Sequence, residues 1–258
     1  MPGFSLFSFM PNSDNKINMD WPDEIDLTEE KLAPGGYGAP GYGRGWAREL
    51  QSTFSEREIT ELAISVGVMS IAFSFLFAGD IAYLFEGNML PLVQSFIIVC
   101  TAFVLHELAH KFTARRYGLW AEYRMWVEGL MFALILPIIT MGHLIFAAPG
   151  AVYITGRHLS KKEDGIISLT GPVTNILLII IFLIGFIISA ALFPGTDGFL
   201  TTLCLYGVLV NLILAAFNML PLPPLDGAAV MKWSPLIWGV IAMPLFMLVI
   251  LVMVFGIS

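Results

Sequence analysis

The chain has 258 residues, of which 57% are hydrophobic and 13% are charged, and this composition indicates a protein that lies in lipid. Its formal net charge of -7 argues against nucleic acid as a partner, because phosphate binding needs clustered lysine and arginine. The two cysteines, Cys100 and Cys204, lie in separate apolar runs, which argues against a disulfide scaffold and leaves no C-x-x-C metal spacing.

Residues 1–57 are acidic and contain a tract rich in glycine and tyrosine, so we expect a flexible tail. Recruitment of a partner through Tyr37 and Tyr42 is an alternative use of this tail. Ser55 and Glu58 resemble a helix capping box, which predicts that a helix begins here. Residues 58–258 are then expected to form the second domain, embedded in the membrane.

Five apolar stretches follow residue 58, each about as long as the roughly 20 residues that a membrane span needs. They cover residues 62–78, 89–113, 166–192, 199–220 and 236–255. We therefore predict an all-α polytopic membrane protein with five to six transmembrane helices, the sixth depending on one ambiguous segment.

The ambiguous segment covers residues 129–156, which are apolar enough to enter the membrane. Prolines and glycines interrupt it, and Ala151 to Ile154 favour a strand over a helix. Lipid cannot satisfy the N–H and C=O groups of a non-helical backbone, so protein or a wet cavity must cover it. A short re-entrant, strand-like element is one reading of the segment, and a sixth span is the other.

The basic residues favour the re-entrant reading. If residues 129–156 dip in without crossing, all 13 lysines and arginines fall in segments on the same side as the tail. The positive-inside rule makes that side the cytoplasm. A crossing would instead move the basic residues of segment 157–164 outside. We therefore expect a multi-pass protein of the cell membrane with a cytoplasmic N-terminus.

The pentapeptide His106-Glu107-Leu108-Ala109-His110 closes the second span. Helical spacing places the two imidazoles about one turn apart on one face, where both can reach one zinc ion. Glu107 lies about 100° around the helix, where it can take a proton from the attacking water without being a ligand. A chance cluster is the alternative, but a charged group deep in a membrane costs roughly 2.5–3.5 kcal/mol, which favours a metal site.

A catalytic zinc site needs a third protein ligand and an open fourth position. Asp226 is the best candidate, because it follows the fourth span on the cytoplasmic side, where nearby prolines break the helix and turn the carboxylate inward. An ordinary Asp-Gly turn is the alternative reading of this residue. His143 in the ambiguous segment is the rival ligand, whereas His158 lies in a basic loop and is expected to be solvated.

These motifs, in this order, resemble the site-2 proteases, zinc metalloproteases that cut transmembrane helices within the membrane. The resemblance rests on residues 106–110, on Gly171-Pro172-Val173-Thr174-Asn175, and on Asn218 followed by Leu225-Asp226-Gly227. It covers roughly residues 60–235 and fits the re-entrant element. No inserted PDZ-like domain or soluble C-terminal domain is evident, and the tail matches nothing in the family.

The resemblance implies the roles of the site residues. His106, His110 and Asp226 would hold one zinc ion per chain, Glu107 would be the general base, and Asn175 and Asn218 would line the site. Substrates would be transmembrane proteins, cut close to the cytoplasmic side. For the two asparagines the alternative is hydrogen bonding between helices, and Asn218 could donate to the oxyanion.

Two other classes of function compete with the protease. A catalytically silent membrane adaptor or chaperone would keep the fold and a structural zinc, although the intact histidine, glutamate and aspartate residues count against it. A metal transporter would also place polar groups at membrane depth, but the inverted repeats that transporters often carry are not evident.

Overall fold

The computed structural model describes residues 53–78, 86–140, 146, 148–156, 158–194 and 198–255. Residues 1–52, which make up most of the expected tail, lie outside this range. Five described helices are long and apolar enough to cross a membrane: α2 (Glu56–Ala78), α4 (Leu90–Arg116), α6 (Lys161–Leu192), α7 (Phe199–Asn218) and α9 (Pro235–Phe255). The all-helical class and its five predicted spans are therefore confirmed.

Two of these helices extend beyond their apolar runs because polar residues start or end them. The α6 helix begins at Lys161, where Ser160 and Glu163 form a complete capping box. The side chain of Ser160 accepts from the Glu163 amide at 3.2 Å, and Oε2 of Glu163 accepts from the Ser160 amide at 3.0 Å. The α4 helix continues to Arg116, with arginines in its last turn near the negative end of the helix dipole.

Two short helices and two strands complete the described chain: α5 (Val127–Ile139), α8 (Asp226–Trp233), β1 (Trp120–Met125) and β2 (Gly150–Thr155). The strands pair antiparallel, with Met125 opposite Gly150. The segment between them therefore starts and ends at the same point of the sheet. The α5 helix within it has 13 residues, which gives about 20 Å, too short for a bilayer core of about 30 Å.

The β1 strand is a difference from expectation, because no strand was predicted in this segment. Two carboxylates of α2 bind the edge of β1 that faces away from β2. The Tyr123 amide donates to Oε1 of Glu58 at 3.0 Å, and the Met125 amide donates to Oε2 of Glu61 at 2.9 Å. Side chains far away in the sequence thus satisfy an edge that would otherwise lie open.

The expected capping box at Ser55 forms only in part. The hydroxyl oxygen of Ser55 accepts a hydrogen bond from the Glu58 amide at 3.0 Å, as an N-cap residue should. The Glu58 carboxylate, however, is engaged with β1 and with Lys111. The motif located the start of α2 correctly, but the Glu58 side chain binds other elements of the fold and does not complete the cap.

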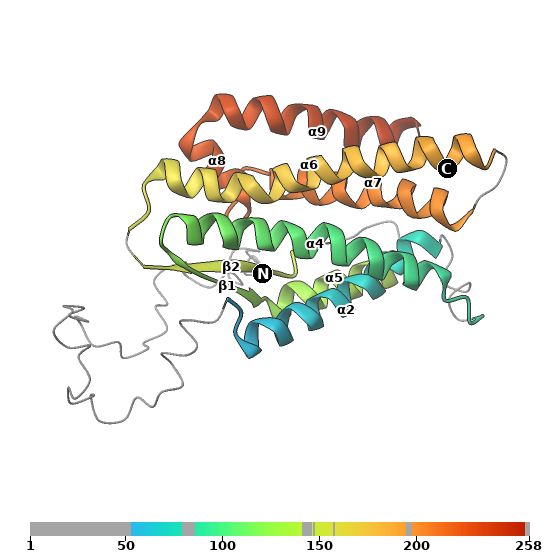
Figure 1. The fold of residues 1–258 in the computed structure, drawn as a ribbon, viewed down its shortest axis with the longest axis horizontal. Coiled ribbons are helices and arrows are strands. Elements are labelled where there is room, and N and C mark those ends of the chain that lie inside the picture. Colours follow the sequence, from blue (N-terminus) through green and yellow to red (C-terminus); the bar gives the residue numbers. More distant parts are fainter. Residues whose placement is uncertain are drawn as a thin grey trace, which may run out of the picture. The chain divides into compact units, whose positions relative to one another are not determined.

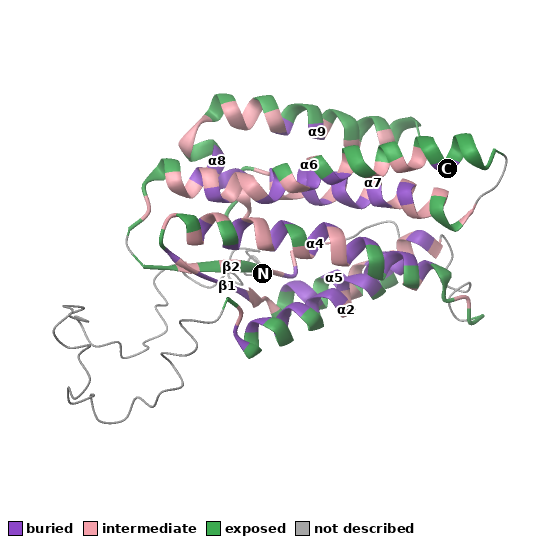
Figure 2. Cartoon of the chain, in the orientation of Figure 1, coloured by how far each residue is buried: buried purple, intermediate pink, exposed green. Residues whose placement is uncertain are grey.

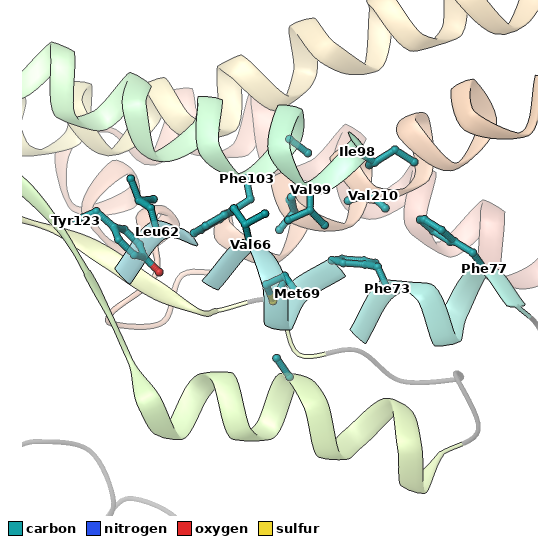
Figure 3. Packing of buried hydrophobic residues seen from close by; sticks show 13 residues of the cluster. Leu62, Val66, Met69, Phe73, Phe77, Ile98, Val99, Phe103, Tyr123 and Val210 are labelled. Atoms are coloured by element: carbon teal, nitrogen blue, oxygen red, sulfur yellow. The ribbon is translucent and has the colours of Figure 1, made fainter. Parts of the chain in front are cut away.

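The main apolar core lies where α2, α4 and the sheet meet (Figure 3). Phe103 of α4 and Tyr123 of β1 pack edge to face, with ring centroids 5.6 Å apart. The outer faces of α6 and α9 are apolar and exposed, as Figure 2 shows, and Met253 of α9 is 77% exposed. Such faces suit lipid and would be costly in water.

The elements that carry the candidate site gather at one end of the helix bundle. Figure 1 shows the end of α4, the start of α6, α8 and the two-stranded sheet at this same end. The predicted site residues at positions 106–110 and at 226 are therefore brought close together from distant parts of the sequence.

Candidate metal centre

The C-terminal half of α4 presents two neighbouring rows of side chains. One row, at positions 102, 106 and 110, faces α6 and α8. The other, at positions 103, 107 and 111, lies about 100° around the helix and faces α2 and β1. The pentapeptide therefore places its two histidines on one side of the helix and Glu107 on the other row.

His106, His110 and Asp226 place three ligand atoms in a small triangle. The two Nε2 atoms of the histidines are 3.0 Å apart. Oδ2 of Asp226 lies 3.3 Å from the Nε2 atom of His106 and 3.2 Å from that of His110. Tetrahedral zinc with bonds of about 2.0–2.2 Å separates its ligand atoms by about 3.3–3.6 Å. The triangle is slightly smaller than this and close to the size that zinc needs.

Hydrogen bonds at the far ring nitrogens leave the triangle rich in lone pairs. Nδ1 of His110 lies 2.8 Å from the carbonyl oxygen of Ile167, which can only accept, so this nitrogen carries the proton. Nδ1 of His106 lies 2.6 Å from Oδ1 of Asn175 and carries a proton for the same reason. In the neutral rings both Nε2 atoms thus offer lone pairs towards Asp226, and a cation between them satisfies all three groups.

Asn175 is held in place by a chain of amides. Its Nδ2 group donates to the Ala102 carbonyl at 3.0 Å and to Oδ1 of Asn211 at 2.9 Å, so its oxygen is the atom that faces His106. The Nδ2 group of Asn211 in turn donates to the Gly207 carbonyl at 2.8 Å. Both asparagines are fully buried. Each amide in the chain has a defined orientation, which fixes the ring of His106.

Asp226 begins α8, directly after the connection from α7. Gly227 packs against the end of α7, where a Cβ atom would lie 2.3 Å from the Met219 carbonyl oxygen. The same oxygen accepts from Nε1 of Trp238 at 2.8 Å, which ties α9 to this turn. Burial raises the pKa of Asp226, but the two imidazoles, when protonated in the zinc-free site, outweigh burial and lower this pKa to about 2. The residue is therefore a carboxylate at neutral pH.

Gly171 of α6 provides the space beside the imidazoles. A Cβ atom at this position would lie 2.4 Å from Nε2 of His110 and 2.6 Å from Nε2 of His106. Real Cβ atoms do not approach other atoms so closely, so any side chain here would displace the rings. The lack of space for any side chain thus explains why the motif from Gly171 to Asn175 begins with a glycine.

Two buried carboxylate oxygens at the site have no hydrogen-bond partner within the described ranges. They are Oε2 of Glu107 and Oδ2 of Asp226. An unsatisfied buried oxygen is costly unless a metal ion, water or substrate meets it. The first oxygen suits a proton acceptor, and the second suits a metal ligand.

The described ligand triangle contains none of the other predicted residues. Asn218, at the end of α7, donates from Nδ2 to the Leu214 carbonyl of its own helix at 3.0 Å. His158 is exposed in the segment before α6, and His143 lies outside the described residues. Asn211 was missed by sequence reasoning, although an asparagine in the middle of an apolar span is itself a signal of a polar contact between helices.

No protein-family model matches the chain, and no solved structure matches it. The curated protein "Putative zinc metalloprotease MJ0611" of Methanocaldococcus jannaschii is 42% identical over 192 residues, which cover 74% of this chain and 92% of that protein. This chain belongs to the site-2 protease family of zinc metalloproteases.

Bacterial relatives carry similar names. "Putative zinc metalloprotease Rip2" of Mycolicibacterium smegmatis is 30% identical over 168 residues, which cover 58% of this chain and 62% of the relative. "Putative zinc metalloprotease YwhC" of Bacillus subtilis is 28% identical over 161 residues, which cover 56% of this chain and 69% of that relative. Zinc is thus the metal that the family membership implies, and the donor set of two imidazoles and a carboxylate suits it.

Proposed function

We propose that this site-2 protease family member is an intramembrane endopeptidase that hydrolyses peptide bonds within transmembrane segments of membrane proteins. His106, His110 and Asp226 hold one zinc ion, and Glu107 is the general base. The observation that carries the proposal is the triangle of ligand atoms, 3.0–3.3 Å on each side. Two of its three residues lie on α4, a helix long and apolar enough to span a membrane.

Glu107 moves the proton in this reaction. Zinc, when bound, supplies a water molecule of lowered pKa and polarises the scissile carbonyl. The unpartnered Oε2 of Glu107 accepts the proton of the attacking water and delivers it to the amide nitrogen as the C–N bond breaks. Its position on the row beside the histidines brings it near the reacting atoms without making it a ligand.

The asparagines have separate roles in the proposal. Asn175 orients His106 through the 2.6 Å contact to Nδ1, so it acts on the metal ligand. Asn218 lines the site and donates to the oxyanion of the tetrahedral intermediate, exchanging its present bond to the Leu214 carbonyl for this one.

Substrate helices must partly unwind, because helical hydrogen bonds hide the carbonyl groups that are to be attacked. The backbone amides of Tyr123 and Met125 point to α2, so the backbone groups of the residues that alternate with them point to β2. In the same alternation, the backbone N–H and C=O groups of Val152 and Ile154 in β2 point away from β1. We propose that this outer edge pairs with the unwound substrate as an added strand, beside α4.

The orientation in the membrane follows from charge. Arg115 and Arg116 lie in the last turn of α4, and Lys161 and Lys162 begin α6, at the end of the bundle that carries the site. By the positive-inside rule this end faces the cytoplasm. The protein is proposed to be multi-pass in the cell membrane, with its N-terminus and its site near the cytoplasmic side.

Substrate trapping tests this function. The Glu107→Gln variant keeps the zinc ligands and should retain uncut substrates, which crosslinking and mass spectrometry identify. The proposal expects membrane-anchored proteins, and cleavage sites of the wild-type enzyme within their transmembrane segments. Bound zinc without any chelator-sensitive cleavage would indicate an adaptor, and zinc uptake into sealed vesicles would indicate a transporter.

A further inference from the structure

A fully buried ion pair lies beside the proposed base and has no part in the mechanism above. Nζ of Lys111 on α4 contacts Oε2 of Glu58 in the first turn of α2, and both side chains are 1% exposed. The ammonium group also lies 4.2 Å from the ring centroid of Phe54, a cation–π contact. Both partners hold Lys111 towards the start of α2.

The same lysine is four residues after Glu107 on the same row of α4. Glutamate followed by lysine at this spacing is the favourable order for an ion pair within a helix. The local sequence alone would therefore pair Glu107 with Lys111. Instead, Oε2 of Glu107 has no hydrogen-bond partner among the residues that the structure covers, and the ammonium lies at Glu58.

Glu58 is itself held rigidly. Its Oε1 accepts the Tyr123 amide at 3.0 Å, while Oε2 takes Lys111, so both oxygens are engaged. The carboxylate is therefore fixed between β1 and α4. A buried charge left without its partner seeks another nearby, and for Lys111 the carboxylate one turn earlier on its helix is Glu107.

We propose that Glu58 is a positioning residue that keeps Lys111 away from Glu107 and so leaves the base free to accept a proton. This inference rests on the proposed function. An ammonium bound to Glu107 would occupy the oxygen that must meet the attacking water. The wild-type protein avoids this arrangement by giving the lysine a better-placed carboxylate.

The first test measures cleavage of a transmembrane substrate together with zinc content. Glu58→Gln should lower kcat by about 100-fold, the lower end of general-base effects, with one zinc still bound per chain. Adding Lys111→Met should restore activity to within a few-fold of wild type. A double variant as inactive as Glu58→Gln, or a fully active Glu58→Gln, would overturn the proposal.

The second test does not depend on proteolysis, so it separates this inference from the proposed function. A double-mutant cycle between Glu107→Gln and Lys111→Met is measured by thermal unfolding. In the Glu58→Gln background the two residues should show a favourable coupling that raises the midpoint temperature of unfolding by about 3 °C. In the wild-type background they should show no coupling. Equal coupling in both backgrounds would contradict the proposal even if no substrate is ever cut.

A milder variant covers the case in which Glu58→Gln does not fold. Glu58→Asp keeps the charge but shortens the side chain by one methylene group, which loosens its hold on Lys111. A partial loss of kcat that Lys111→Met removes is expected. Unchanged activity in Glu58→Asp, or a loss that Lys111→Met leaves in place, would count against the inference.

Discussion

Nδ1 of His106 lies 2.6 Å from Oδ1 of Asn175, and this contact determines which nitrogen of the ring faces Asp226. The asparagine cannot present its amino group instead, because that group already donates to the Ala102 carbonyl and to Asn211. The metal ligand is thus oriented from outside the site, by a residue of another helix.

Removing this acceptor should weaken zinc binding. In Asn175→Leu the Nδ1 proton of His106 loses its partner, and the ring is free to turn. We expect the zinc affinity to fall by about 10- to 100-fold, the usual effect of losing such a partner. Competition with a chelator of known affinity measures it.

Asn218→Leu is the matched control, because its amide bonds only within its own helix among the contacts that the structure describes. Its zinc affinity should equal that of wild type. Similar losses of zinc in both variants would mean that buried polarity in general, and not the contact to His106, is responsible. The cleavage rate of zinc-loaded Asn218→Leu separately tests the proposed oxyanion role.

Gly171→Ala should abolish zinc binding. The new methyl carbon would lie 2.4 Å from Nε2 of His110, so the imidazoles must move out of the triangle. Gly67→Ala and Gly239→Ala are controls, because nothing lies within 4 Å of a Cβ atom at either position. Metal content per chain, measured by mass spectrometry, should fall only in the first variant. Full occupancy in Gly171→Ala would contradict the described packing.

Asp226 should make the zinc-free protein sensitive to acid. Its folded-state pKa of about 2 lies below its ordinary value of 3.8, so its contacts stabilise the fold above about pH 4. That contribution, about 2 kcal/mol, is lost as the pH falls towards 2. The difference in unfolding free energy between wild type and Asp226→Asn should therefore shrink by this amount between about pH 5 and pH 2. A difference in unfolding free energy that stays constant over this pH range would contradict the prediction.

The membrane spans were predictable because each is a long apolar run whose signal is local. The α6 helix illustrates both the strength and the limit of this signal. Its apolar run ends at Leu192 as expected, but its start lies at Lys161, set by the Ser160 capping box. Polar residues can extend a helix past the part that composition reveals.

The β1 strand was not predicted because its causes are distant in the sequence. Glu122 and Arg124 alternate with buried Ala121 and Tyr123, a period typical of strands, but the run is short. The carboxylate of Glu58 and the pairing with β2 decide the outcome. Neither contact can be read from the local pattern.

At the site, the convergence of the two histidines could be inferred from spacing alone, whereas the contacts that support them could not. Asn211 and the Glu58–Lys111 pair act through contacts between helices. The sequence around Lys111 favours a local ion pair with Glu107, and the fold replaces it. Tertiary contacts overrode the local preference at this point.

The central claim is that Glu107 is the base of a zinc-dependent intramembrane protease. The direct measurement follows cleavage of a transmembrane substrate in reconstituted vesicles by wild type and by Glu107→Gln, with zinc content determined for each. Cleavage by wild type should stop on chelation and return with added zinc, and Glu107→Gln should be inactive with one zinc bound. Cleavage by zinc-loaded Glu107→Gln at the wild-type rate would contradict the account.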